Sequence, residues 1–172
     1  MKNIFKIVVL VLFVLVTLIS CSESKSSAPD PEGVISIVPS VLETTIDDTF
    51  LLSIEVKDIT KLFACSFELQ FDDDIIDFVP NSNVAGTFWD NTEVLTFSMK
   101  EDNKVSVSVG YFQTGNLNGK SGNGELISFS FNGKLIGSTD IVIKNLEMID
   151  ENGNEIPYFE KVTKIPTTIT VK

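Results

Sequence analysis

The residue types best suited to chemistry lie in the stretch KLFACSFELQFDDDIIDF, residues 61–78. Cys65 could serve as a nucleophile, and the acidic run Asp72–Asp74 with nearby Asp77 could offer oxygen ligands to calcium. The chain has no His, and its 13 basic residues are all Lys. Nucleophile systems that use His, zinc sites built on His and Arg clamps for phosphate are therefore excluded.

Paired carboxylates could still hydrolyse a glycosidic bond without any of those groups. The acidic residues are, however, scattered over turn-like segments, and the sequence shows no insertion that would form a pocket. We therefore expect a protein that is not an enzyme, with no catalytic residue, no cofactor and no metal site.

The residues around Cys65 alternate with the two-residue period of a β-strand. One face of this strand carries Phe63, Cys65, Phe67, Leu69 and Phe71, and the other carries Ala64, Ser66, Glu68 and Gln70. Cys65 is thus predicted to point into the core and to behave as a small apolar side chain.

Calcium binding and a solvated turn are the two interpretations of Asp72–Asp74. Three adjacent carboxylates at the end of a strand point in different directions, and no Asp-x-Asn-x-Asp-Gly loop accompanies them. The turn is therefore favoured. The same alternatives apply to Asp150–Glu155, where the Gly stands in the wrong place for a calcium loop and a hairpin turn is favoured.

Strand-like alternation continues through most of residues 33–172 and predicts about nine short strands. A hairpin is expected around Glu101–Lys104, with the apolar faces of its two strands directed to the core. Those faces are Leu95, Phe97 and Met99 before the turn, and Val105, Val107 and Val109 after it. No window shows a helical stripe, so an all-β, two-sheet β-sandwich is predicted.

The chain begins with a pattern typical of export. Lys2 and Lys6 precede the apolar run Ile7–Ile19, and residues 1–21 end in Leu-Ile-Ser-Cys. This ending resembles a bacterial lipobox, which implies cleavage before Cys21 and lipid attachment to that residue. A plain signal peptide and a membrane anchor helix are the alternatives, although the run is shorter than the ~20 residues that a bilayer-spanning helix needs.

Residues 22–32 are polar and rich in Ser and Pro, and they predict a flexible tether before one domain at residues 33–172. Without residues 1–21 the chain has 11 Lys against 24 Asp and Glu, a formal charge of −13. This charge repels nucleic acid and anionic lipid. We therefore expect an exported protein that acyl chains hold at the bacterial membrane, facing the cell surface or the periplasm.

Three blocks in the domain together resemble a cohesin domain. They are FELQFDDDIIDF at residues 67–78, GNGELISFSF at residues 122–131 and DENGNEIP at residues 150–157. The resemblance implies a jelly-roll-like sandwich of nine strands that binds dockerin modules in polysaccharide breakdown. It also places Asp72–Asp74 at a corner of the sandwich, with Asp73 where the family usually has Pro.

The resemblance implies a partner-binding sheet face, although Ala64 and Ser66 stand where well-known cohesins carry Asn and Asp. A partner preference different from theirs is therefore expected. The flat face is predicted to carry small and polar side chains: Ala64, Ser66, Glu68, Gln70, Thr96, Ser98, Ser106 and Ser108. An ordinary solvated sheet face is the alternative.

Two further functions stay open. A carbohydrate-binding sandwich would need exposed aromatic rings to stack on sugars, and Trp89, Tyr111 and Tyr158 are the candidates. A structural surface lipoprotein would need neither a protein partner nor a glycan.

Overall fold

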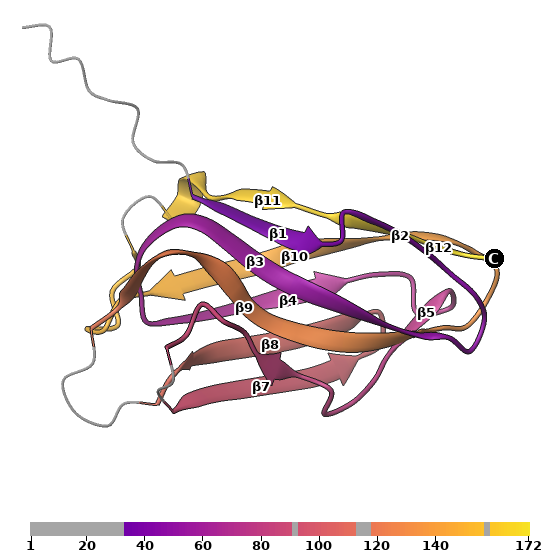
Figure 1. Cartoon of the computed structure of the whole chain (residues 1–172), viewed down its shortest axis with the longest axis horizontal. Coiled ribbons are helices and arrows are strands. Elements are labelled where there is room, and N and C mark those ends of the chain that lie inside the picture. Colours follow the sequence, from indigo (N-terminus) through magenta and orange to yellow (C-terminus); the bar gives the residue numbers. More distant parts are fainter. Residues whose placement is uncertain (1–32, 91–92, 113–117, 157–158) are drawn as a thin grey trace, which may run out of the picture. The chain divides into compact units, whose positions relative to one another are not determined.

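Two β-sheets make up the part of the chain that the computed structural model describes, residues 33–90, 93–112, 118–156 and 159–172 (Figure 1). These residues all lie within one unit, Pro31–Lys172. The predicted all-β sandwich is confirmed. The predicted leader and tether, with Cys21, lie outside the described residues, as does Tyr158.

The described residues form twelve strands and one short 3-10 helix. The elements are β1 (Val34–Val38), β2 (Val41–Thr44), β3 (Thr49–Leu62), β4 (Ala64–Gln70), β5 (Ile76–Phe78), β6 (Val84–Ala85), β7 (Val94–Glu101), β8 (Lys104–Tyr111), β9 (Lys120–Gly133), β10 (Gly137–Ile149), η1 (Phe159–Lys161), β11 (Thr163–Ile165) and β12 (Thr167–Val171). The short strands β2, β6 and β11 were not expected, because two to four residues are too few to show a period.

The first sheet has the order β11-β1-β3-β9-β5, with β6 also paired to β9. The second sheet has the order β2-β12-β10-β4-β8-β7. The strands of both sheets run along the long axis of the domain (Figure 1). Two parallel pairs, β1 with β11 and β2 with β12, join the beginning of the described chain to its end.

The core lies between the sheets and is filled by the apolar face of each long strand. Phe131 of β9 is fully buried and contacts Phe71 and Phe78 edge to face, at ring-centroid distances of 5.4 Å and 5.5 Å. Burying a Phe side chain stabilises a fold by about 1.5 to 3 kcal/mol. This packing holds the domain together, since the domain has one cysteine and no partner for a disulfide.

Within residues 33–90, 93–112, 118–156 and 159–172, no helix has the length and apolar character needed to cross a membrane.

Candidate functional site

The outward side of strands β10, β4, β8 and β7, named here the outer face, holds most of the predicted partner-binding residues. In β4, Ala64, Ser66, Glu68 and Gln70 are partly exposed and alternate with buried residues. The register pairs Ser66 with Ser108 and Glu68 with Ser106 of β8. Since paired residues point to the same side of a sheet, the predicted placement of Ala64, Ser66, Glu68, Gln70, Ser106 and Ser108 on one face is confirmed.

The predicted placement of Thr96 and Ser98 on this face is wrong. Their register partners are Val109 and Val107, which are buried, so both side chains point inward. There the side-chain amide of Asn83 donates to Thr96 Oγ1 at 2.7 Å, and its oxygen accepts from Ser98 Oγ at 2.8 Å. A polar contact with the segment before β6 therefore takes the place of an apolar layer at this edge.

On the outer face, β7 presents a row of large apolar side chains to solvent. These side chains were expected to face the core. Leu95, Phe97 and Met99 are 59%, 57% and 45% exposed. Their register partners in β8 are Gly110, Ser108 and Ser106. We name these three side chains the ridge; it stands beside the small residues of the outer face.

A hollow of about 490 Å³ lies between the ridge and β10. Its floor and walls include Ala64, Ser66, Ser108, Gly110, Leu95, Phe97, Glu147 and Ile149. The floor is low because its side chains are small. At Gly110 the space is fully used, since a Cβ there would lie 2.4 Å from the Cβ of Ala64.

Charged groups occupy the outer face near the β7–β8 turn. Lys104 Nζ lies 2.9 Å from Glu68 Oε1 and 3.4 Å from Glu101 Oε2, and Asn145 Nδ2 donates to Glu68 Oε2 at 2.8 Å. The hydrogen bond from Lys104 lowers the pKa of Glu68, and the same contact raises the pKa of Lys104. At the rim of the hollow, Glu147 accepts a long hydrogen bond of 3.5 Å from Ser66 Oγ.

Cys65 lies beneath the outer face and is 4% exposed. Burial raises the pKa of its thiol to about 12, so the reactive thiolate does not form at neutral pH. The prediction that Cys65 belongs to the core is confirmed.

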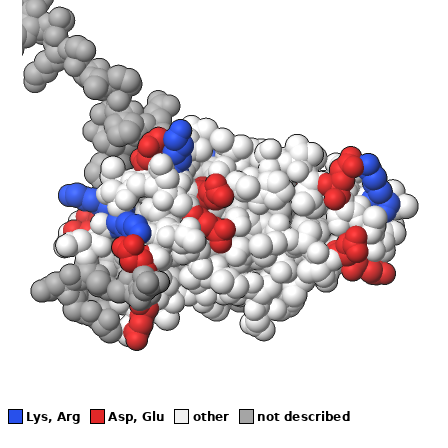
Figure 2. All heavy atoms as spheres, viewed as in Figure 1, with Lys and Arg blue, Asp and Glu red and all other residues white. Residues whose placement is uncertain are grey.

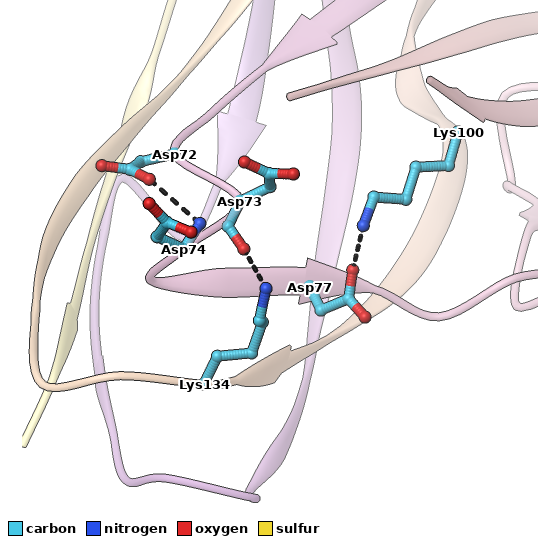
Figure 3. Close-up of polar contacts among 6 residues, drawn as sticks. All are labelled: Asp72, Asp73, Asp74, Asp77, Lys100 and Lys134. Atoms are coloured by element: carbon cyan, nitrogen blue, oxygen red, sulfur yellow. Dashed lines mark hydrogen bonds and ion pairs between the residues drawn. The ribbon is translucent and has the colours of Figure 1, made fainter. Parts of the chain in front are cut away.

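Asp72–Asp74 form the corner at which the chain crosses from β4 in the second sheet to β5 in the first (Figure 3). Asp72 Oδ1 accepts from the backbone N–H of Asp74 at 3.0 Å, and Lys134 Nζ donates to the Asp73 carbonyl. Asp77 is paired with Lys100 of β7. The carboxylates point in different directions (Figure 3), and the predicted turn is confirmed.

The second acidic segment also forms the predicted turn. Asp150 Oδ1 accepts from the backbone N–H groups of Asn152 and Asn154, each at 2.9 Å, and these bonds lower the pKa of Asp150. The backbone N–H of Ile156 then donates to the carbonyl of Met148 at 3.1 Å, which closes the hairpin. Among the described residues, no three acidic or cysteine side chains are arranged to hold a metal ion.

The aromatic residues proposed for glycan stacking are not exposed where the structure describes them. Trp89 and Tyr111 are 5% and 8% exposed, and their rings pack edge to face at 5.1 Å. Trp89 Nε1 also donates to the carbonyl of Leu126 at 2.8 Å. The prediction that Trp89 and Tyr111 form an exposed stacking platform is therefore wrong, because both rings are buried in the core.

Charged side chains do not form a broad patch on the side of the domain shown in Figure 2. On the side shown in Figure 2, Lys, Asp and Glu side chains gather toward two ends, and the area between is mostly uncharged apart from acidic groups near its middle. This side therefore does not provide the basic stripe that nucleic acid requires.

No protein-family model matches the chain, and no curated protein is similar to it in sequence. Solved structures are similar in fold. One is a non-cellulosomal cohesin from the hyperthermophilic archaeon Archaeoglobus fulgidus, which is 18% identical with a TM-score of 0.65, over 82% of this chain and 91% of that chain. Another is a type II cohesin domain from the cellulosome of Acetivibrio cellulolyticus, 16% identical with a TM-score of 0.65, over 81% of this chain and 95% of that one.

A third similar structure is the third cohesin of ScaC from Acetivibrio cellulolyticus, solved in complex with the ScaB dockerin. It is 16% identical with a TM-score of 0.66, and the match covers 81% of this chain and 98% of that chain. The domain therefore has the cohesin fold, and the resemblance seen in the sequence is confirmed at the level of the fold.

Proposed function

We propose that this chain is a bacterial lipoprotein whose cohesin-fold domain binds a dockerin-like protein module through the outer face, in the breakdown of polysaccharide. The observation that carries the proposal is the hollow between the ridge and β10, in a fold whose similar structures include cohesins in complex with dockerins. The domain acts by binding and has no catalytic role. The charged start, apolar run and cysteine of residues 1–21 support lipid attachment at Cys21 and a location at the cell surface or in the periplasm.

The chemistry of the outer face describes the partner. Its floor of Ala, Gly and Ser side chains lets a helix approach closely, and Leu95 and Phe97 offer apolar contact beside it. Ala64 and Ser66 stand where well-known cohesins carry Asn and Asp. A partner that depends on hydrogen bonds to those Asn and Asp side chains would leave polar groups unpaired here. The partner should therefore present an apolar surface to the hollow.

Charge replacement on the floor tests the proposal. A panel of purified dockerin modules is titrated into Ser22–Lys172, the part of the chain that follows the predicted lipidation site, and the partner that binds is titrated into the Ser66→Lys and Ser108→Lys variants of the same fragment. Both variants should fold, since surface changes usually alter stability by less than ~0.5 kcal/mol. Both should bind more than ~10-fold more weakly, because a charge desolvated at the centre of an interface costs several kcal/mol.

Thr163→Lys is the matched control, because Thr163 is exposed on β11 of the other sheet. Calorimetry measures the affinities, and circular dichroism checks the fold. Unchanged affinity of both Lys variants for every module that the native chain binds would refute the outer face as the site. Retention of the chain on insoluble polysaccharide, with no dockerin module bound, would instead favour a carbohydrate-binding protein.

A further inference from the structure

We propose that Glu147 makes the outer face selective for a partner helix that carries a Lys or Arg side chain beside an apolar stripe. This inference rests on the proposed use of the outer face for protein binding, and it adds the charge that the partner must present. Three features of the hollow support it: the residues of its two walls, its width and its one carboxylate.

Two rows of paired residues cross the hollow from β10 to β7. The register sets Glu147, Ser66, Ser108 and Phe97 in one row, and Ile149, Ala64, Gly110 and Leu95 in the next. All eight residues line the hollow. The β7 end of each row therefore belongs to one wall, the β10 end belongs to the opposite wall, and small side chains form the floor between them.

The width of the hollow fits a single helix. Neighbouring strands lie about 4.7–4.9 Å apart, so the three steps from β10 to β7 separate the backbones of the two walls by about 14 Å. An α-helix with its side chains is about 10 to 12 Å across. One helix can therefore lie along the strands, close to the floor.

Glu147 is the one charged residue among those that line the hollow. It forms no ion pair with any other described residue, and its hydrogen bond from Ser66 Oγ is long, at 3.5 Å. By contrast, Glu68 and Glu101 of the same face are both paired with Lys104. Since Ser66 belongs to the floor, the Glu147 carboxylate leans over the hollow and is available to a partner.

A helix seated in the hollow would remove water from the Glu147 carboxylate. Loss of water costs free energy unless the carboxylate gains a new partner. A Lys or Arg side chain on the helix would supply charged donors, and its aliphatic stem could lie against Ile149. A neutral or acidic side chain at the same place would leave the carboxylate unpaired, so Glu147 acts against such partners.

The opposite wall sets the rest of the pattern expected in the partner. Leu95 and Phe97 are 59% and 57% exposed and lie two residues apart on β7, a rise of about 6.8 Å. Helix positions i and i+4 rise by about 6 Å, so apolar side chains at these positions match the two exposed residues. Position i+5 lies about 100° further round the helix and would face Glu147.

Three synthetic helical peptides test the charge preference directly. Each is rich in Ala with Leu at i and i+4, and position i+5 carries Arg, its uncharged isostere citrulline, or Glu. They are titrated into Ser22–Lys172 at low salt, and fluorescence anisotropy measures the affinities. The Arg peptide should bind about fivefold more tightly than the citrulline peptide, as a partly screened ion pair allows. The Glu peptide should bind most weakly, and high salt should reduce these differences.

Variants of the domain assign the preference to one side chain. Glu147→Gln should bind the Arg and citrulline peptides equally, and Glu147→Lys should reverse the order so that the Glu peptide binds most tightly. Glu55→Gln is the matched control and should keep the native order, because Glu55 is exposed on β3 of the other sheet. Circular dichroism checks that each variant is folded.

Equal binding of the three peptides by the native domain would overturn the inference. So would a preference for Arg that Glu147→Gln leaves intact, or no binding of the Arg peptide at millimolar concentration. If a dockerin module binds the outer face while the peptides show no charge preference, the inference fails and the proposed function stands. A charge preference that depends on Glu147, with no dockerin module bound, would support the inference and count against a dockerin-like partner.

Discussion

At the scale of single residues, Cys65 illustrates how an isolated thiol becomes inert. It lies in β4 between buried Phe63 and Phe67 positions, and burial raises its pKa to about 12. The alternation of apolar and polar residues was sufficient to predict this, because every second residue of β4 faces the core. The absence of His and Arg from the sequence led to the same prediction, because a reactive cysteine usually has such a neighbour.

Replacing Cys65 with Ser should destabilise the domain. The hydroxyl would enter an apolar layer, which costs about 1 to 3 kcal/mol if it finds no hydrogen-bond partner. Chemical denaturation of Ser22–Lys172 and of Cys65→Ser measures the difference, with Cys65→Ala as the control that removes the thiol and adds no polar group.

Labelling of native Cys65 by a thiol reagent should be undetectable at neutral pH and become fast in denaturant. Fast labelling without denaturant would show that the thiol is exposed and would contradict its assignment to the core.

Also at the residue scale, the ridge shows where sequence reasoning failed. Leu95, Phe97 and Met99 were expected in the core because apolar residues usually are, yet alternation alone does not say which face is buried. The turn contained the missing information. Pairing Glu101 with Lys104 sets Met99 opposite Ser106 and Phe97 opposite Ser108, and these serines alternate with core valines.

At the scale of elements, the corner between β4 and β5 depends on a contact made across the second sheet. The backbone N–H of Asp72 donates to Thr139 Oγ1 of β10 at 2.9 Å, and Thr139 is 7% exposed. Sequence reasoning predicted the corner from its aspartates. It could not predict Thr139, because that residue lies 67 positions away and only the folded sheet brings it close.

Thr139→Val should therefore weaken the corner without changing the shape of the side chain. The Asp72 N–H would lose its acceptor in a partly buried place, at a cost of about 1 to 3 kcal/mol. The free energy of unfolding measures this loss, and Thr60→Val, at an exposed position of β3, is the control. Equal stability of the two variants would show that the contact with Asp72 contributes nothing.

At the scale of the whole molecule, the sequence predicted a two-sheet sandwich because most strands show a clear period of two. It could not give the order of the strands in each sheet, since β10 lies between β12 and β4 through contacts far apart in the chain.

The lipid anchor is tested on the full chain in a bacterial host. Cys21→Ala removes the residue predicted to carry the acyl chains, so the protein should leave the membrane fraction and appear in the soluble fraction. Surface charge offers no substitute, because the processed chain is strongly acidic. Immunoblots of the fractions measure the change, with Ser22→Ala as the control; unchanged membrane retention of Cys21→Ala would refute the lipoprotein proposal.

The two parallel pairs that join the start and end of the described chain also determine when the domain can finish folding. β2 pairs with β12 alone, more than 120 residues later in sequence, and β1 pairs with β11 at a similar separation. Because a chain is synthesised from its N-terminus, β2 remains unpaired until β12 has been made. Such distant pairings slow folding and prolong exposure of apolar strands, so this domain should depend on protection while it folds more than its modest size suggests.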